Sequence, residues 1–274
     1  PLFRSSAASD VYKRQGATSG RTTLNGEGLQ HQDGHSHILS STIPNCLSYD
    51  PTYAYEVATI VKNGIKKMYI DQENYFYYIT TINENYTHPE MPKDCEEGII
   101  KGMYVLSDNE SYDVRLLGSG AILREALKAK DILFKFKIKA QVWSVTSFNL
   151  LRKDGMEIER YNQLNPSGKQ KLTYVEECFS DSNVPVIAAT DYMRSYAEQI
   201  RPYIHSSYTT LGTDGYGRSD SRQTLRDFFE VDSKSIARAA IYALYKNDKI
   251  DKNQIENYYK ELGIDSNKPN PWEI

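Results

Sequence analysis

The sequence predicts an α/β protein built around a largely parallel sheet. In the second part of the chain, short apolar stretches alternate with helical patterns, and one stretch enters a Gly-Ser-Gly turn at residues 118–120 before a helix. Strands that alternate with helices favour a parallel sheet covered on both faces. We therefore expect residues 108–274 to form a three-layer α/β domain, preceded at residues 16–107 by the tail of another α/β domain.

The first of these segments is expected to contain a helix followed by a strand. Asp50-Pro51 is typical of a helix start, with Asp50 as the N-cap and Pro51 at the first helical position. Apolar residues then keep a helical period as far as Lys67. The run YFYYITTIN, from Tyr75, is rich in aromatic and β-branched residues and predicts a buried strand. A polar loop with two prolines follows it and is a natural place for a domain boundary.

The second segment repeats the order of strand, turn and helix. Residues 113–120 predict a strand that ends in the glycine turn, and residues 121–133 predict a strongly amphipathic helix. Three further strands are expected at KAQVWSVTSF (139–148), NVPVIAATD (183–191) and TTLGTD (209–214). The last helices are expected in SDSRQTLRDFF (219–229), SKSIARAAIYALYKN (233–247) and NQIENYYKEL (253–262).

The composition is that of an ordinary globular protein. Hydrophobic residues make up 39% and charged residues 25% of 274 residues, and no apolar run approaches the roughly 18 residues of a membrane span. The net charge of −3 provides no basic field, which argues against nucleic acid as a main partner. Three widely spaced cysteines, Cys46, Cys95 and Cys178, suggest no disulfide framework and fit a reducing cytoplasm. Residues 1–15 lack an apolar period, and we interpret them as a non-native or disordered leader.

Three of the five histidines lie within seven positions, in GEGLQHQDGHSHI (26–38). His31, Asp33, His35 and His37 follow an H-x-D-x-H-x-H spacing among glycines. This pattern favours an acid/base or substrate-orienting cluster, because imidazole moves protons near neutral pH. Two alternatives stay open: a structural polar loop, and a metal site, although metal sites usually also recruit a distant ligand.

Two glycine-rich turns are weaker candidates. Gly118-Ser119-Gly120 between a strand and a helix could cradle a phosphate, but it matches neither of the established phosphate-loop patterns. In LGTDGYGRSDSR (211–222), Asp220 or Ser219 is placed to cap the next helix. Two arginines of that loop, Arg218 and Arg222, could hold a carboxylate or pair with the nearby aspartates.

Several motifs together resemble one family, the homodimeric bacterial pyruvate dehydrogenases, which are the thiamine-diphosphate-dependent decarboxylating components of the pyruvate dehydrogenase complex. The motifs are GRTTLNGEGLQH with DGHSH, IPNCLSYDPTYAYEVA, YYITTINENY, LLGSGAILREA, VWSVTSFNLLRKDG, ATDYM and LGTDGYGRSDSRQTLRDFFEVD. The resemblance covers residues 16–274. It implies that residues 16–107 are the end of the middle, thiamine-pyrimidine-binding domain, and that residues 108–274 are a transketolase-type C-terminal domain.

The resemblance also implies where the chemistry lies. His31 is expected near the thiazolium, to orient pyruvate or move a proton, and Glu27 is expected in the same channel. Asp33, His35 and His37 are expected to stabilise the loop and the tautomer of His31. The residues that hold thiamine diphosphate and magnesium belong to sequence upstream, so this chain is expected to contribute no cofactor or metal ligand and to be inactive alone.

The resemblance further implies a homodimer that transfers an acetyl group from pyruvate to a lipoyl-bearing dihydrolipoamide acetyltransferase in the cytoplasm. No nucleic-acid or membrane partner is expected. Two other functions remain in view. The chain could be a non-catalytic dimerisation and docking scaffold, or, less favoured, a histidine-ligated metallohydrolase.

Overall fold

The computed structural model describes residues 20–26, 28–107, 111–180 and 183–273. The glycine-rich start carries a short 3-10 helix, η1 (Leu29–His31), and helix α2 (Ser36–Ser41). A two-stranded parallel sheet follows, in which β1 (Cys46–Tyr49) pairs with β2 (Phe76–Ile79). Between these strands run α3 (Ala54–Ile65) and its π-helical continuation η2 (Lys66–Ile70).

Helix α3 begins later than the sequence predicts. Asp50 was expected as the N-cap, but the residue before the helix is Tyr53. The first turn is held instead by Glu56, whose carboxylate accepts hydrogen bonds from the backbone N–H groups of Thr52 and Tyr53 at 2.5 and 2.8 Å. Asp50 is unavailable for capping because its side chain is fully buried in contacts with other elements.

Strand β2 is less buried than the sequence predicts. Phe76 is 39% exposed and the other three residues of the strand are half-buried, whereas all four residues of β1 are buried. In the described residues β2 has one strand neighbour, β1, so it lies at a sheet edge. Its aromatic and β-branched composition predicted a strand correctly but could not indicate which faces would be covered.

The main sheet has five strands in the order β3-β5-β4-β6-β7. Its strands are β3 (Met103–Ser107), β4 (Val114–Gly118), β5 (Ala140–Val145), β6 (Val186–Ala189) and β7 (Tyr208–Leu211). The β4–β5, β4–β6 and β6–β7 pairs are parallel, and β3 runs antiparallel to β5 at the edge. The expected α/β class with a mostly parallel sheet is therefore confirmed.

Strand β3 lies in the main sheet although the sequence analysis placed residues 103–107 in the preceding segment. Met103 pairs with Val145 and Tyr104 with Ser144, so the strand is tied to β5 by backbone hydrogen bonds. The main sheet thus begins at Met103, ahead of the expected division between residues 107 and 108. We keep the division into two domains as a proposal, with its boundary before Met103.

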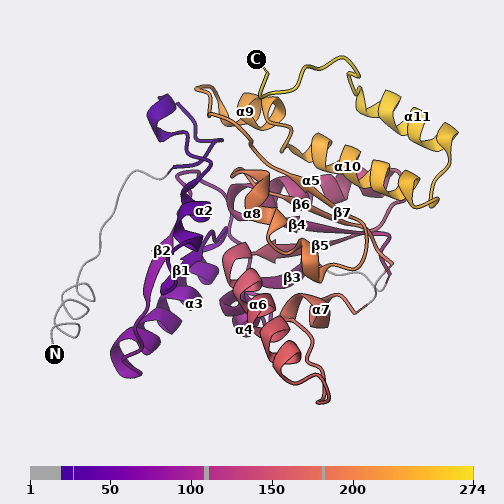
Figure 1. The fold of residues 1–274 in the computed structure, drawn as a ribbon. Helices are drawn as coiled ribbons and strands as arrows, with labels where there is room; N and C mark the ends of the chain where they lie inside the picture. Colours follow the sequence, from indigo (N-terminus) through magenta and orange to yellow (C-terminus); the bar gives the residue numbers. More distant parts are fainter. Residues whose placement is uncertain (1–19, 27, 108–110, 181–182, 274) are drawn as a thin grey trace.

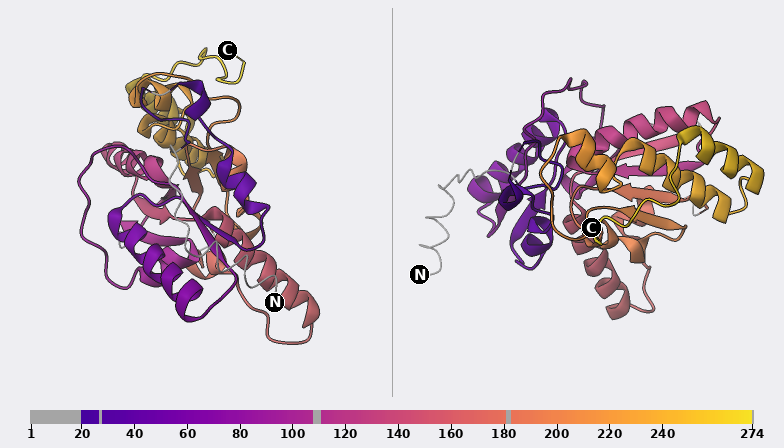
Figure 2. Two further views of the ribbon diagram at one scale, coloured as in Figure 1. Left: turned by 90° about the vertical axis from the view of Figure 1, so that its left-hand side faces the viewer. Right: turned by 90° about the horizontal axis from the view of Figure 1, so that it is seen from above.

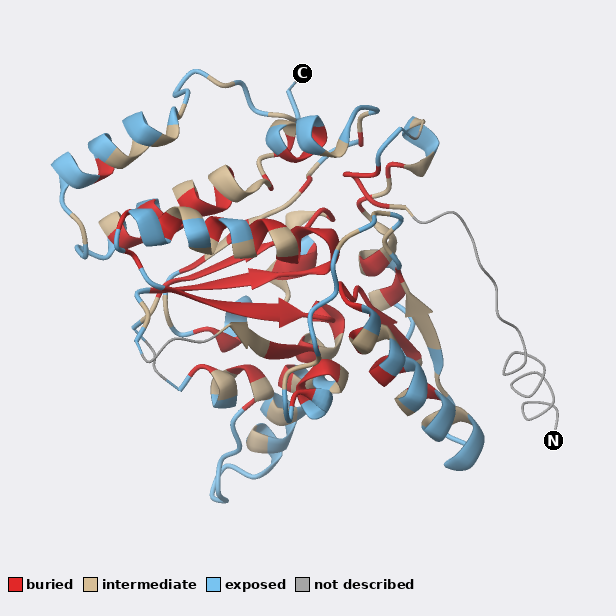
Figure 3. Ribbon diagram, turned by 180° about the vertical axis from the view of Figure 1, so that it is seen from behind, coloured by how far each residue is buried: buried red, intermediate tan, exposed pale blue. Residues whose placement is uncertain are grey.

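Helices cover both faces of the main sheet (Figure 1). One face carries α5 (Leu123–Lys135) and α10 (Ser233–Lys246), and the other carries α6 (Phe148–Leu164), α7 (Tyr174–Cys178) and α8 (Arg194–Glu198). Leu123, Ala126 and Leu133 keep the helical period of α5 and are fully buried, as a one-sided helix requires. Figure 3 shows the central strands buried and the outer helix faces exposed.

The remaining helices are short or peripheral. They are α4 (Glu96–Lys101), η3 (Gly120–Ile122), η4 (Arg201–Tyr203), α9 (Arg222–Phe228) and α11 (Lys252–Leu262). The N-cap of α9 is Ser221, whose hydroxyl accepts a hydrogen bond from Thr224 N–H, and not Asp220 or Ser219 as expected. Among the described helices, none combines the length and apolar character that a membrane span requires.

Candidate functional site

The parallel strands of both sheets end in polar residues that meet at one junction. Asp50 follows β1, Thr80 follows β2 and Ser119 follows β4. The hydroxyls of Thr80 and Ser119 each donate a hydrogen bond to the Asp50 carboxylate at 2.7 Å, which joins the two sheets. In open α/β sheets, ligands bind outside the carboxyl ends of the strands. This junction is therefore the natural place to look for a functional site.

Arg21 crosses the junction. Its guanidinium donates to Asp50 at 2.8 Å and to Asp191, which follows β6, at 2.9 Å. All three side chains are at most 2% exposed, and the guanidinium also lies over the Tyr192 ring at 5.5 Å. Burying charge is costly unless it is paired and hydrogen-bonded, and here each charge has an opposite partner.

Arg21 and Asp50 hold each other in their ionised forms. Burial alone would raise the pKa of Asp50, but Arg21 and the two hydroxyl donors outweigh it and bring that pKa below its ordinary value. Burial alone would lower the pKa of Arg21, and the two carboxylates reverse that, so its pKa lies above the ordinary value. At neutral pH this is a fixed ionic link between the glycine-rich start and both sheets.

Arg21 opens the stretch that carries the histidines, which we call the histidine segment (residues 20–37). Thr22 donates to the backbone oxygen of Asp191 at 2.5 Å, and Thr23 donates to its carboxylate at 2.8 Å. The side-chain amide of Gln32 donates to Leu24 O at 2.8 Å and closes the loop between them. The start of the segment is thus fixed on the carboxyl ends of the strands.

The loop after β7 closes over the same segment. A Cβ built on Gly217 would come within 2.1 Å of the Cβ of Gln32, so only glycine allows this approach. Gly26 N–H donates to Asp220 O at 3.4 Å on the same loop. The histidine segment is consequently held between the main sheet and residues 212–220.

His31 ends the short helix η1 at the outer turn of the histidine segment. It is half-buried, and its neighbour Leu29 is 61% exposed. Among the described residues no side chain forms a hydrogen bond with its imidazole. The other expected catalytic residue, Glu27, lies outside the described residues. The backbone of His31 is held by a hydrogen bond in which its N–H donates to Gly28 O at 3.0 Å. Part of the residue remains exposed.

Asp33 and His35 serve the backbone of the segment. The Asp33 carboxylate accepts hydrogen bonds from the N–H groups of His35 and Ser36 at 2.7 and 3.2 Å, which satisfies free donors at the start of α2. The side chain of His35 is 44% exposed, and its Nδ1 lies 3.7 Å from Oδ1 of Asp33. These contacts stabilise the loop as expected, but they do not reach the His31 ring and so do not set its tautomer.

His37 is fully buried and faces away from solvent. Its Nε2 lies 3.0 Å from the Thr80 hydroxyl, which itself donates to Asp50. The ring stacks on Tyr196 with centroids 4.8 Å apart and meets the rings of Tyr192 and Tyr78 edge to face. Burial lowers the pKa of His37 to about 4, so the imidazole is neutral at pH 7. Its role is to pack the segment onto the junction.

Three of the five histidines use a ring nitrogen in contacts within the protein. His37 is bound to Thr80, His88 accepts a hydrogen bond from Ala54 N–H at 3.0 Å, and His205 lies 2.8 Å from Glu176. In the described parts of the chain, no three His, Cys, Asp or Glu side chains converge as metal ligands do.

The Gly118-Ser119-Gly120 turn does not form a phosphate cradle. Gly120 N–H donates to Asp50 O at 3.1 Å, and Ser119 N–H donates to Ala189 O at 3.2 Å. A Cβ on Gly120, which has φ of +51°, would meet the Asp50 carboxylate at 2.2 Å. Asp50 therefore fills the space that a phosphate would need.

The two arginines of the loop after β7 do not converge on a carboxylate ligand site. Arg222 donates to Asn83 O and Oδ1, both at 3.1 Å, and lies 3.6 Å from Glu84. Arg218 bonds to the backbone oxygens of its own loop. These contacts fit the second expectation, in which the two arginines pair within the protein. The acidic partner of Arg222 is, however, Glu84 and not an aspartate.

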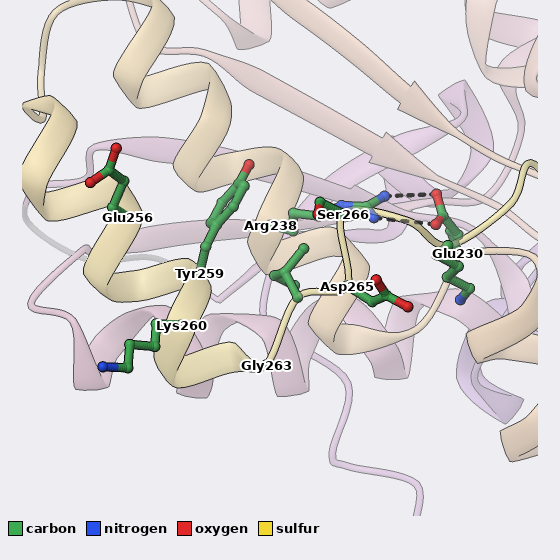
Figure 4. A pocket seen from close by; sticks show the side chains of 10 residues that line it. Glu230, Arg238, Glu256, Tyr259, Lys260, Gly263, Asp265 and Ser266 are labelled. Atoms are coloured by element: carbon green, nitrogen blue, oxygen red, sulfur yellow. Dashed lines mark hydrogen bonds and ion pairs between the residues drawn. The ribbon is translucent and has the colours of Figure 1, made fainter.

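A surface pocket lies elsewhere, between α10, α11 and the chain that follows α11 (Figure 4). Charges of both signs line it, and Arg238 and Glu230 pair across one side at 2.8 and 3.2 Å. No residue of the histidine segment contributes to it. The hollow is thus separate from the junction.

Comparison with known families accounts for both parts of the chain. A family model described as the pyruvate dehydrogenase E1 component middle domain matches residues 5–89, and one described as the transketolase-like TK C-terminal domain matches residues 102–232. The chain belongs to the pyruvate dehydrogenase E1 component family. The first match begins inside the stretch 1–15 that we set apart as a leader, and those residues lie outside the described part.

The pyruvate dehydrogenase E1 components of two bacteria illustrate the relationship. The chain is 56% identical over 261 residues to the one from Pseudomonas aeruginosa and 52% identical over 261 residues to the one from Escherichia coli. Each match covers 93% of this chain and 30% or 29% of the relative. The chain thus spans about 30% of the length of these curated relatives.

Solved structures confirm the fold. A variant transketolase from Pichia stipitis superposes with a TM-score of 0.62 at 20% identity, covering 84% of this chain and 30% of that one. A transketolase from Leishmania mexicana gives a TM-score of 0.58 at 16% identity, with the same coverage. The transketolase-type C-terminal domain expected from the sequence is therefore confirmed as a fold.

Sequence reasoning missed Arg21, Thr80 and Asp191 as parts of the junction. The signal was present, because Thr80 comes directly after β2 and Asp191 lies two residues after the end of β6. A polar residue at that position belongs to the edge where ligands bind. Arg21 gave no such signal, since its burial depends on two carboxylates that lie 29 and 170 positions away.

Proposed function

We propose that this chain forms part of a 2-oxo acid dehydrogenase that decarboxylates pyruvate with thiamine diphosphate and passes the acetyl group to a lipoyl-bearing domain. Family membership supports the reaction class. The observation that carries the proposal is the placement of the histidine segment across the carboxyl ends of the strands of both sheets. His31 is the catalytic residue of that segment, and Glu27 acts beside it.

The cofactor is held by residues outside this chain. At the Gly118-Ser119-Gly120 turn, Asp50 occupies the space that a phosphate would need. Thiamine diphosphate supplies the electron sink for decarboxylation when it is bound. What this chain contributes is a rigid loop that carries a titratable imidazole next to the reacting groups.

The junction explains how such a loop can be positioned. Catalytic groups need supporting side chains that fix their geometry. Here the contacts of Arg21, Gln32 and His37 fix the histidine segment, while His31 stays partly exposed. An imidazole in that position can orient a keto acid and move a proton near neutral pH.

His31→Ala tests the proposal in the full-length polypeptide that carries this chain. Turnover, measured as carbon dioxide released from pyruvate, should fall at least about tenfold, within the roughly 100- to 10,000-fold range of acid/base catalysis. Thermal unfolding should change little, because the side chain is only half-buried and no described side chain hydrogen-bonds to it.

His35→Ala is the matched control, since it is a nearby, partly exposed imidazole of the same segment. It should keep most of the activity. Equal losses in both variants, with release of a bound metal ion, would instead support the metallohydrolase alternative. Full activity of His31→Ala would remove His31 from the catalytic role.

A second candidate is a non-catalytic dimerisation and docking scaffold. It is favoured by an apolar row on α3 and η2, where Val61, Ile65 and Tyr69 are 38 to 46% exposed. In that case Ile65→Glu should disrupt assembly in size-exclusion chromatography, while His31→Ala should leave both assembly and activity unchanged.

The assembly and location proposed for the protein follow the same family membership. We propose a homodimer in the bacterial cytoplasm that meets a dihydrolipoamide acetyltransferase through its lipoyl domain. The three described cysteines, Cys46, Cys95 and Cys178, are free thiols, which is compatible with a reducing compartment.

A further inference from the structure

The last residues of the chain return toward the histidine segment. After α11 the chain turns at Gly263, which has φ of +60°, and runs back across the molecule to α9 (Figure 1). The view from above in Figure 2 shows the same course. Lys268 anchors it there, because its ammonium donates to Asp227 O at 2.5 Å and lies 3.3 Å from the Asp227 carboxylate.

The tail then places Trp272 on the loop after β7. A local turn, in which Asn270 Oδ1 accepts from Trp272 N–H at 3.3 Å, orients the residue. The Arg194 guanidinium lies 5.2 Å from the centre of the indole, within cation–π range. A Cβ built on Gly215 would lie 3.6 Å from the Trp272 Cβ, which is ordinary van der Waals contact.

Arg194 links Trp272 to the loop after β7. Its Nε donates to the Asp214 carboxylate at 2.6 Å, and its backbone N–H donates to the other carboxylate oxygen at 3.0 Å. The neighbouring Thr213 N–H donates to Tyr192 O at 2.8 Å. Trp272, Arg194 and Asp214 thus form a chain of contacts from the C-terminal tail to residues 212–220.

Those loop residues hold the histidine segment directly. Gly217 is in contact with Gln32, Asp220 O accepts from Gly26 N–H, and the hydroxyls of Thr213 and Thr22 are 2.8 Å apart. Gln32 follows His31 in the chain. A change in the loop is therefore transmitted to the backbone on which His31 lies.

We propose that Trp272 is a positioning residue, and that the C-terminal tail is a strap that fixes the loop 212–220 and, through it, the histidine segment. The structural part of this inference stands without any assumption about activity. Its effect on turnover rests on the proposed function of His31.

Hydrogen–deuterium exchange of the full-length protein tests the structural part. Trp272→Ala should speed exchange of the Arg194 and Thr213 N–H groups about two- to fivefold, the size expected for loss of an exposed cation–π contact. Deletion of residues 269–274 should speed it about tenfold. Trp272→Phe should restore protection because it keeps an aromatic face over Arg194. Unchanged exchange in both Trp272→Ala and the deletion would overturn the proposal.

Tyr242→Ala is the matched control, because Tyr242 is an aromatic residue on α10 that is 51% exposed, against 54% for Trp272. It should leave the exchange of both N–H groups unchanged. Equal acceleration by Tyr242→Ala would show a general loosening of the fold and would also overturn the proposal.

Turnover separates the strap from the proposed function. In an active protein, Trp272→Ala should lower kcat about three- to tenfold with little change in KM, and Trp272→Phe should restore it. Faster exchange in a protein that has no activity in its wild-type form would refute the proposed function alone. An active wild type with unchanged exchange and unchanged kcat in Trp272→Ala would refute the strap alone.

Discussion

At the scale of single residues, the junction brings together four buried ionisable side chains. Arg21, Asp50 and Asp191 are charged and almost fully buried, and His37 is buried without charge. The difference follows from their partners, because the guanidinium has two carboxylates while the imidazole has a hydroxyl and three tyrosine rings. Each group takes the charge that its surroundings can stabilise.

His37 gives the folded protein a dependence on acid. Its pKa is about 4 in the fold, against an ordinary value of 6.5, so the unfolded chain binds the proton first as the pH falls. The contribution of His37 to the free energy of unfolding is fully present above about pH 6.5. As the pH falls toward 4 this contribution is lost progressively, by roughly 3 kcal/mol in all. Urea unfolding of wild type and His37→Gln at several pH values measures the effect.

The expected result is a smaller loss of unfolding free energy in His37→Gln between pH 6.5 and 4.5 than in wild type. Above pH 7 the two proteins should differ by an amount that does not change with pH. Parallel curves over the whole range would mean that the pKa of His37 is the same in the folded and the unfolded chain, and would contradict this prediction.

At the scale of elements, the glycine turn between β4 and α5 is where the two sheets touch. Gly120 adopts a left-handed conformation and leaves room for the Asp50 carboxylate, whose partners outside the turn are Thr80, which follows β2, and Arg21 of the histidine segment. The turn was expected to be merely tight or to bind phosphate. Its occupant is instead a side chain from another part of the same molecule.

Gly120→Ala should therefore be more damaging than an alanine at a glycine that has a similar positive φ but open surroundings. Gly263 has φ of +60° with no atom within 4 Å of a built Cβ, so Gly263→Ala measures backbone strain alone, about 1–2 kcal/mol. Gly120→Ala adds the clash with Asp50, about 1–3 kcal/mol more. Chemical unfolding of both variants gives the difference, and equal losses would contradict this assignment.

For the whole molecule, Arg21 is the central tie between the two sheets. Arg21→Met should leave the carboxylates of Asp50 and Asp191 buried without a charged partner, which costs about 3–5 kcal/mol. The matched change Arg238→Met breaks a partly exposed ion pair with Glu230 and should cost no more than about 1 kcal/mol. Unfolding free energies of the two variants test this ranking, and a cost for Arg21→Met as small as that for Arg238→Met would refute it.

Local patterns determined most of the elements. The amphipathic period predicted α5, α10 and α11 within a few residues, because burial on one face of a helix imposes a repeat that the sequence displays directly. Short β-rich runs predicted five of the seven described strands, and they did not predict β1 or β3. The same local reasoning selected the histidine segment, since three of the five histidines lie within seven positions among glycines.

Tertiary structure alone decided which residues of that segment are buried and what they bind. Local sequence does not distinguish the surroundings of His31, His35 and His37. In the fold only His37 is buried, His35 lies beside the Asp33 carboxylate, and His31 is half-buried. The fold also turned Asp50 from an expected helix cap into the partner of Arg21, and it assigned β3 to the main sheet. The physical reason is that the pKa and partners of a buried charge, and the neighbour of an edge strand, depend on atoms brought together from distant positions, which no local repeat encodes.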